Sequence, residues 1–154
     1  MRVQLKLFRE KKYSSRKIAR TLSTRAYNHV VMKAGRPILR KHHFLIKKTL
    51  RETQERFGLR IRAIAIMPDH VHLVVQVPSR ALFANAMRFL AGMIALRIGK
   101  GKLWRARCWS RIVREGRDLW NATTYVWRNS IKAGIIDERD TAWIQNGMLV
   151  TDYG

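Results

Sequence analysis

The sequence predicts an α+β domain: an antiparallel sheet with two helices on one face, followed by a further C-terminal helix. Three observations predict it. Strand-like and helix-like segments follow one another in the order β-α-β-β-α-β-α. The two middle strands are separated by a connection short enough for a hairpin, so they should pair antiparallel. The 154 residues are 47% hydrophobic and include five Trp, which suffices for one core.

The first half of the chain supplies three strands and one helix. Residues 28–33 form a short strand that stops at Ala34-Gly35. Apolar residues recur at a helical period over residues 38–57, and Gly58 supplies the C-terminal stop. Residues 59–67 alternate in polarity, and residues 70–77 resume strand composition after Pro68-Asp69.

The second half supplies two helices around one strand. Pro78-Ser79 opens a helix over residues 80–98. Residues 103–114 have strand character, with Trp109 on the same face as several arginines. Asp118 is the expected N-cap of a helix over residues 118–133. The first six elements are in the order of a ferredoxin-like, split βαβ sandwich.

Charge is the strongest compositional signal. Lys and Arg number 32 against 10 Asp and Glu, a net charge of +22, which predicts a polyanionic partner such as nucleic acid. Residues 1–48 hold 15 of these cations with one acid, and the acid-free stretch between Asp69 and Glu115 holds nine. We interpret the organisation as three parts: a basic N-terminal arm (1–25), one folded domain (26–136) and a C-terminal tail (137–154).

The single cysteine, Cys108, excludes an internal disulfide framework and a zinc site with several Cys ligands, and it favours a reducing compartment. No uninterrupted apolar stretch approaches the roughly 18–20 residues of a membrane span. Cations interrupt the first 19 residues, so they do not resemble a signal peptide. We therefore expect a soluble protein with no membrane partner and a cytoplasmic, nucleoid-associated location.

The triplet His70-Val71-His72 is the first candidate site. Strand alternation places both imidazoles on one face, where they can chelate one ion while Val71 packs on the other face. Unligated surface or hydrogen-bonded histidines are the alternative. We interpret the three remaining histidines, which show no such context, as structural: His29, His42 and His43.

The helix over residues 118–133 holds the second candidate. Its polar stripe places Tyr125 between Asn121 and Asn129, with Lys132 on the same side. Cationic neighbours and a metal would favour the phenolate and so activate Tyr125 as a nucleophile. A tyrosine at the edge of the core is the alternative.

Two segments carry a family resemblance. Residues 67–75, MPDHVHLVV, resemble the His-hydrophobic-His segment of the HUH single-strand endonucleases, specifically the transposases of the IS200/IS605 type and the REP-associated tyrosine transposases. Residues 125–134, YVWRNSIKAG, resemble the catalytic-tyrosine helix of that family, and the 53 positions from His72 to Tyr125 suit its spacing. Ser130 is a departure, because many relatives have Pro there.

The resemblance implies a ferredoxin-like domain that acts on DNA. It implies that His70 and His72 are metal ligands, that Asn129 is the third, polar ligand, and that Tyr125 is the nucleophile. The implied ion is Mg²⁺ or Mn²⁺. The implied reaction is attack of the tyrosine on a DNA phosphate, which gives a 5′-phosphotyrosine link and a free 3′-OH, followed by strand rejoining.

Single-stranded or hairpin DNA is the implied partner, bound by a monomer or a homodimer. Cations that contact phosphates and aromatic faces that stack bases are typical of such binding. The candidate DNA-binding residues are Arg105, Arg107, Trp109, Arg111 and Lys132. A non-catalytic basic nucleic-acid-binding protein that retains the fold is the alternative function, and an RNA- or ribosome-associated protein is a third.

Overall fold

The computed structural model describes residues 20–99 and 101–134. The predicted tail and most of the predicted arm lie outside these residues. The elements follow in the order β1 (Tyr27–Lys33), η1, a short 3-10 helix (Leu39–His42), α1 (His43–Phe57), β2 (Arg60–Ile66), β3 (His70–Gln76), α2 (Arg80–Ile98), β4 (Trp109–Val113) and α3 (Arg117–Lys132).

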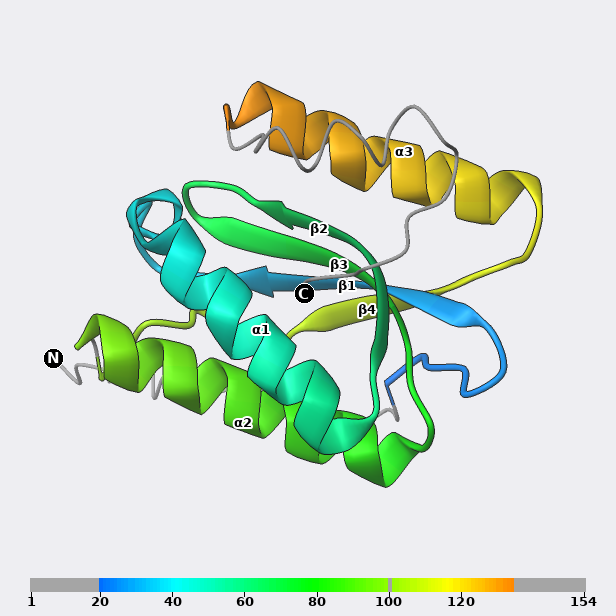
Figure 1. Ribbon diagram of the computed structural model, residues 1–154, viewed down its shortest axis with the longest axis horizontal. Helices are drawn as coiled ribbons and strands as arrows, with labels where there is room; N and C mark the ends of the chain where they lie inside the picture. Colours follow the sequence, from blue (N-terminus) through cyan, green and yellow to red (C-terminus); the bar gives the residue numbers. More distant parts are fainter. Residues whose placement is uncertain (1–19, 100, 135–154) are drawn as a thin grey trace, which may run out of the picture.

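The four strands form one antiparallel sheet in the order β2-β3-β1-β4. Strand β3 therefore lies between β1 and β2, the two strands that α1 connects, which is the split βαβ arrangement. Helices α1 and α2 cover one face of the sheet and α3 lies on the other (Figure 1). The predicted fold class and the predicted β2–β3 hairpin are confirmed.

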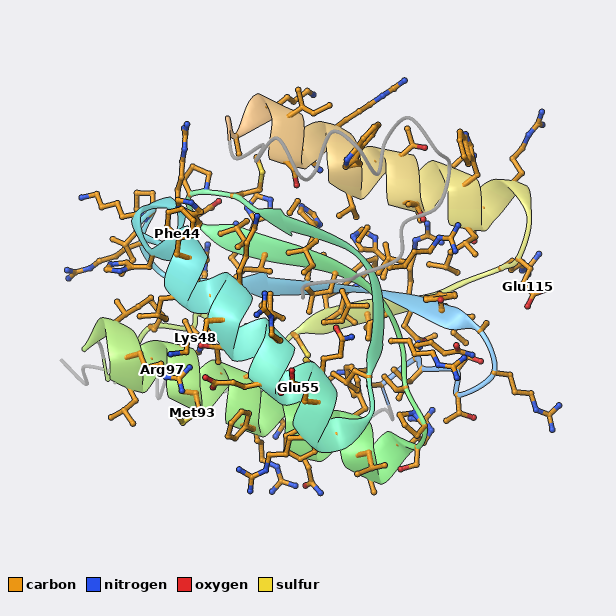
Figure 2. All side chains as sticks on the ribbon, viewed as in Figure 1. Phe44, Lys48, Glu55, Met93, Arg97 and Glu115 are labelled. Carbon is orange, nitrogen blue, oxygen red and sulfur yellow. The ribbon has the colours of Figure 1, made fainter. Side chains whose placement is uncertain are left out.

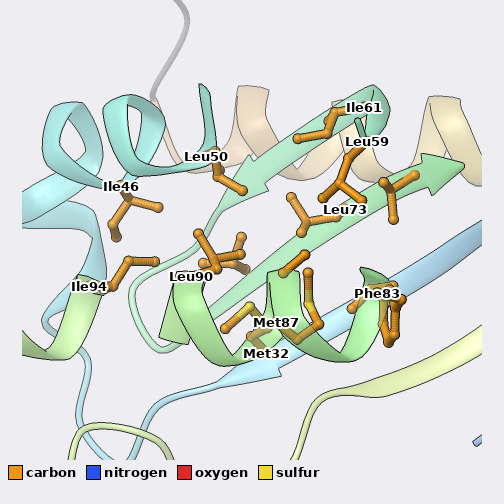
Figure 3. Close-up of a cluster of buried hydrophobic side chains, with 14 of the residues drawn as sticks. Met32, Ile46, Leu50, Leu59, Ile61, Leu73, Phe83, Met87, Leu90 and Ile94 are labelled. Carbon is orange, nitrogen blue, oxygen red and sulfur yellow. The ribbon is translucent and has the colours of Figure 1, made fainter. Parts of the chain in front are cut away.

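The larger core lies between the sheet and the helices α1 and α2 (Figure 3). Alternation along β3 sends Val71, Leu73 and Val75 into it, each at most 1% exposed. The helices contribute their largest buried side chains from positions three or four apart: Ile46 and Leu50 from α1, and Phe83, Met87, Leu90 and Ile94 from α2. This core supplies most of the buried apolar surface on which the sheet rests.

The opposite face of the sheet packs against α3 through small side chains. The cluster consists of Ala63, Ala65, Val74 and Val113 from the strands and Ala122 and Val126 from α3. Short side chains on both surfaces let the helix axis approach the sheet closely. The result is that α3 lies directly over the face on which β3 presents its even-numbered residues.

The predicted strand over residues 103–114 is wrong in its extent, because only Trp109–Val113 forms β4. The indole of Trp104 donates a hydrogen bond to the carbonyl of Ala91 on α2 (2.9 Å), which turns this segment toward the helix. It meets the end of β1 and the two residues after it through the isolated bridge between Ala34 and Trp104 and through two backbone hydrogen bonds, from the Arg105 amide to Lys33 and from the Gly35 amide to Leu103.

Two helix starts also differ from prediction. The first four residues of the predicted helix after Ile38 form η1, a 3-10 turn, before α1 begins at His43. Asp118 is not the N-cap of α3, because Gly116 occupies that position at φ 78°. The carboxylate of Asp118 turns away to accept hydrogen bonds from Arg111 and from the amide of Arg114.

Helix α2 is the one helix of the described residues that is long and apolar enough to cross a membrane. Core helices of soluble proteins share this length and composition. In α2, Arg88 and Arg97 interrupt the apolar sequence, and one face of the helix packs against α1 and the sheet.

Replacing Leu90, which is fully buried, with Ala should lower the free energy of unfolding by about 2–5 kcal/mol, because the change leaves a cavity. Leu96 on the same helix is 73% exposed, so Leu96→Ala is the matched control and should change stability by less than about 0.5 kcal/mol. Urea unfolding measures both. Equal losses from the two variants would contradict this core assignment.

Candidate functional site

The candidate site lies on the face of the sheet that α3 covers. His70 and His72 both point to this face, with ring centroids 4.7 Å apart and ring planes at 80°. Val71 between them is buried on the opposite face. The predicted alternation therefore brings the two imidazoles together.

His70 is held by its neighbour in the chain. Its Nδ1 lies 2.6 Å from Oδ1 of Asp69, and this hydrogen bond is the main reason that the pKa of Asp69 is lowered. Asp69 is positioned in turn by its backbone carbonyl, which accepts a hydrogen bond from the amide of Ala34 (2.7 Å). A proton held between Nδ1 and the carboxylate leaves Nε2 of His70 as its free nitrogen.

His72 is more deeply placed. It is 5% exposed, its Nδ1 lies 3.0 Å from Nε2 of His29, and its own Nε2 is buried with no hydrogen-bond partner. Burial, together with the neighbouring His70 and His29, lowers the pKa of His72 to about 4. Burial and then the charge of Arg111 lower the pKa of His29. Both buried imidazoles are therefore neutral at neutral pH.

The interpretation of His29 as lacking any site context is wrong. In the register of β1 and β3, His29 stands opposite Val74 and Val31 stands opposite His72, so His29 lies diagonally across from His72 on the same face. The sequence shows a lone His in a short strand. Only the pairing of β1 with β3, between residues 43 positions apart, places it beside the triplet.

Tyr125 lies over the same histidines. Its ring centroid is 5.6 Å from that of His72 and 6.0 Å from that of His29, with the rings edge to face. The side chain belongs to the polar stripe of α3, and the residue is 53% exposed. Asn129, one helical turn further, has a buried side-chain nitrogen without a partner. The structure thus brings His70, His72 and Tyr125 of one chain together, and Asn129 follows Tyr125 by one turn of the same helix.

The residues present fit a divalent cation with an unusual third ligand. In the described part of the chain, no group of three or more His, Cys, Asp or Glu residues is placed to hold a metal ion. A site on His70 and His72 therefore needs a ligand of another type, for which the amide oxygen of Asn129 is the candidate. The unpartnered Nε2 of His72 is the buried polar atom that ion binding would satisfy.

Polar contacts at both ends fasten α3 to the sheet. Near its C-terminal end, the hydroxyl of Ser130 donates to the carbonyl of Ile64 on β2 (2.8 Å), a bond that proline at this position cannot make. Near its N-terminal end, the guanidinium of Arg111 on β4 binds both oxygens of Asp118 at 3.1 Å. Arg111 was predicted to contact DNA, but in the structure its charge is engaged with the helix.

The other predicted DNA-binding residues lie at the surface. Trp109, at the start of β4, is 54% exposed and meets the ring of His29 edge on at 5.8 Å. Arg105 and Arg107 are exposed in the bend that precedes β4, and Lys132 is exposed in the last turn of α3. The ring of Trp109 therefore lies against the histidine cluster.

Comparison with known proteins decides the family. The model of the family described as "Transposase IS200 like" matches residues 22–138, which include the histidine triplet, Tyr125 and Asn129. The chain belongs to this family. The resemblance seen in the sequence is confirmed.

The chain is also similar to a curated protein and to a solved structure. A Haemophilus influenzae protein named as a REP-associated tyrosine transposase is 24% identical over 106 residues, which cover 59% of our chain and 60% of that protein. Our chain thus matches less than two thirds of that relative's length. A solved structure of a REP-associated tyrosine transposase bound to a REP hairpin matches with a TM-score of 0.70 and 15% identity, over 88% of our chain and 89% of that one. The IS200-like chain shares its fold.

The Arg111–Asp118 pair should stabilise the attachment of α3 in a pH-dependent way. Its hydrogen bonds hold the pKa of Asp118 below the ordinary 3.8, so its contribution is present above pH 4 and is lost as the pH falls below that value. Asp118→Asn should lower the free energy of unfolding at pH 7 by about 0.2–1 kcal/mol, the usual range for exposed ion pairs.

Thermal unfolding of the wild type and Asp118→Asn between pH 3 and pH 7 measures this difference. The matched control is Glu115→Gln, which changes an exposed carboxylate just before α3 (Figure 2). A destabilisation by Asp118→Asn that is as large at pH 3 as at pH 7 would contradict the assignment.

Proposed function

We propose that this IS200-like family member cuts and rejoins single-stranded or hairpin DNA, with Tyr125 as the nucleophile. The observation that carries the proposal is the position of Tyr125, whose ring stands edge on against His72 while half of its surface is open to a substrate. The family assignment supports a DNA-cleaving activity. The hairpin bound by the solved REP-associated relative supports the class of substrate.

In this proposal His70, His72 and Asn129 hold Mg²⁺ or Mn²⁺. When bound, the ion would supply Lewis acidity to the scissile phosphate. Two imidazoles favour Mn²⁺ over Mg²⁺, because nitrogen is a better ligand for the softer ion.

The reaction is a balanced exchange of phosphate esters. The phenolic oxygen of Tyr125 forms a bond to phosphorus as the bond from phosphorus to the 3′-oxygen breaks. The phenolic proton leaves through the exposed side of Tyr125, and the departing 3′-oxygen takes up a proton to become a free 3′-OH. Attack of a 3′-OH on the 5′-phosphotyrosine link reverses these steps and rejoins strands without ATP.

We further propose that one chain suffices to form the site. Tyr125 contacts His72 and His29 of its own chain, and Ser130 and Asp118 hold α3 against its own sheet. Contacts at both ends of the helix support cleavage by a monomer. The proposal therefore expects adduct formation by a monomeric fraction of the protein.

The surface around the site supplies a route for a strand of DNA. Trp109 offers a half-exposed ring next to His29, on which a base near the scissile phosphate would stack. Arg105 and Arg107 precede Trp109 in the chain, Lys132 lies in the last turn of α3, and all three are exposed, so they would supply cations for the phosphates. The net charge of +22 provides the long-range attraction.

Tyr125→Phe should abolish the covalent adduct between protein and a labelled hairpin oligonucleotide in Mn²⁺, because it removes only the attacking oxygen. Denaturing gel electrophoresis detects the adduct, and fluorescence anisotropy should show DNA affinity close to that of the wild type. Tyr27→Phe is the matched control, since it removes a hydroxyl from β1 on the same side of the sheet and should retain the adduct.

An undiminished adduct with Tyr125→Phe would contradict the assignment of the nucleophile. A wild-type protein that binds the hairpin in a salt-sensitive way but forms no adduct and makes no nick in Mn²⁺ would instead be the non-catalytic binding protein.

Trp109→Ala should weaken binding of single-stranded DNA by about 1–3 kcal/mol, roughly 5- to 150-fold in the dissociation constant, because it removes a stacking surface. Phe44→Ala is the matched control. Phe44 is 75% exposed, but it lies at the start of α1 on the far side of the sheet (Figure 2). Fluorescence anisotropy measures both constants, and equal losses would contradict a stacking role for Trp109.

A further inference from the structure

His29 is a buried polar residue whose side chain the proposed reaction does not use directly. It is 7% exposed on β1, and its Nε2 lies 3.0 Å from Nδ1 of His72. The centroids of the two rings are 5.3 Å apart and the ring planes are inclined by 26°. A hydrogen bond between two neutral imidazoles needs one ring to donate and the other to accept, so it couples their tautomers.

The environment of His72 determines which direction of this hydrogen bond is useful. A metal ion needs the lone pair of an imidazole nitrogen, and the other nitrogen then carries the proton. Nδ1 of His72 faces His29, while its Nε2 is buried and has no partner in the structure. If Nδ1 carries the proton, the Nε2 lone pair is directed away from His29 and remains available.

We propose that His29 is a positioning residue that accepts a hydrogen bond from Nδ1–H of His72 and thereby presents the Nε2 lone pair of His72 to the metal. This inference rests on the proposed function. Asp69 makes the equivalent contact with Nδ1 of His70 at 2.6 Å. Both predicted ligands are thus held at Nδ1 by a neighbouring side chain, the arrangement usual for metal-binding histidines.

His29 also has a packing role that a test must separate from the hydrogen bond. Its ring meets Tyr125 at 6.0 Å and Trp109 at 5.8 Å, both near edge on. His29→Phe keeps an aromatic ring between these neighbours but removes the acceptor. His29→Gln removes the ring but keeps a carbonyl acceptor for Nδ1–H of His72. Each variant therefore keeps one of the two properties, the aromatic ring or the hydrogen-bond acceptor, and removes the other.

The first measurement needs neither metal nor DNA. Long-range ¹H–¹⁵N spectra of metal-free protein, with the His72 signals assigned through His72→Gln, report which ring nitrogen carries the proton. We expect the proton on Nδ1 in the wild type and in His29→Gln, and a shift toward Nε2–H in His29→Phe. Circular dichroism establishes that each variant is folded.

The second measurement is Mn²⁺ affinity, from the electron paramagnetic resonance signal of free Mn²⁺. His29→Phe should raise the dissociation constant roughly 10- to 100-fold, the usual effect of losing such a supporting contact, and His29→Gln should restore most of the affinity. Arg88→Gln, a change of an exposed residue on α2, on the other face of the sheet, should leave the dissociation constant for Mn²⁺ unchanged.

A wild-type His72 that carries its proton on Nε2 overturns the inference whether or not any variant folds. A folded His29→Phe that keeps both the Nδ1–H tautomer and an affinity within about twofold of the wild type also overturns it. Failure of the proposed function looks different: Tyr125 forms no adduct or the wild type binds no Mn²⁺, while the tautomer of metal-free His72 still reports on His29.

Discussion

The close packing of α3 on the sheet is the interaction on which the candidate site depends. Alanine and valine side chains from β2, β3, β4 and α3 form this interface, so the helix comes near enough for Tyr125 to touch His72. Larger side chains at Ala65 or Ala122 would raise the helix and withdraw the tyrosine from the histidines. The hydrogen bond of Ser130 to Ile64 and the ion pair of Asp118 with Arg111 then fix the position of the helix along the sheet.

In the proposed function, burial prepares the histidines to act as metal ligands. Removing His72 from water disfavours its charged form, so its ring remains neutral and able to accept. The same burial makes each ring nitrogen need a partner, because an unsatisfied polar atom inside a protein is costly. Supporting contacts from His29 and Asp69 satisfy one nitrogen of each ligand. In the proposed function, the second nitrogen of each ring is left for the metal ion.

Most of the fold could be predicted from the sequence, because periodicity, Ser79, Gly58 and the short Pro-Asp connection act locally. That Tyr125 lies beside the His70–His72 pair could be expected from the family resemblance, because each lies in a short motif of fixed spacing. His29 could not be found this way, since its role depends on pairing between distant strands. The pairing of Arg111 with Asp118 could not be predicted either, because it depends on the tertiary structure. The same holds for Trp104, whose indole donates a hydrogen bond to Ala91 on α2, so that this segment does not continue the predicted strand.

The two-sided burial of β3 also limits how this gene segment can change. Its odd-numbered residues, Val71, Leu73 and Val75, form the core under α1 and α2, and its even-numbered residues face α3. Deleting or inserting one residue between Asp69 and Val75 would send the histidines into the apolar core and the valines to the site. A single insertion in β3 should therefore impair folding and function together. The segments around η1 and before β4 can vary in length without exchanging the two faces.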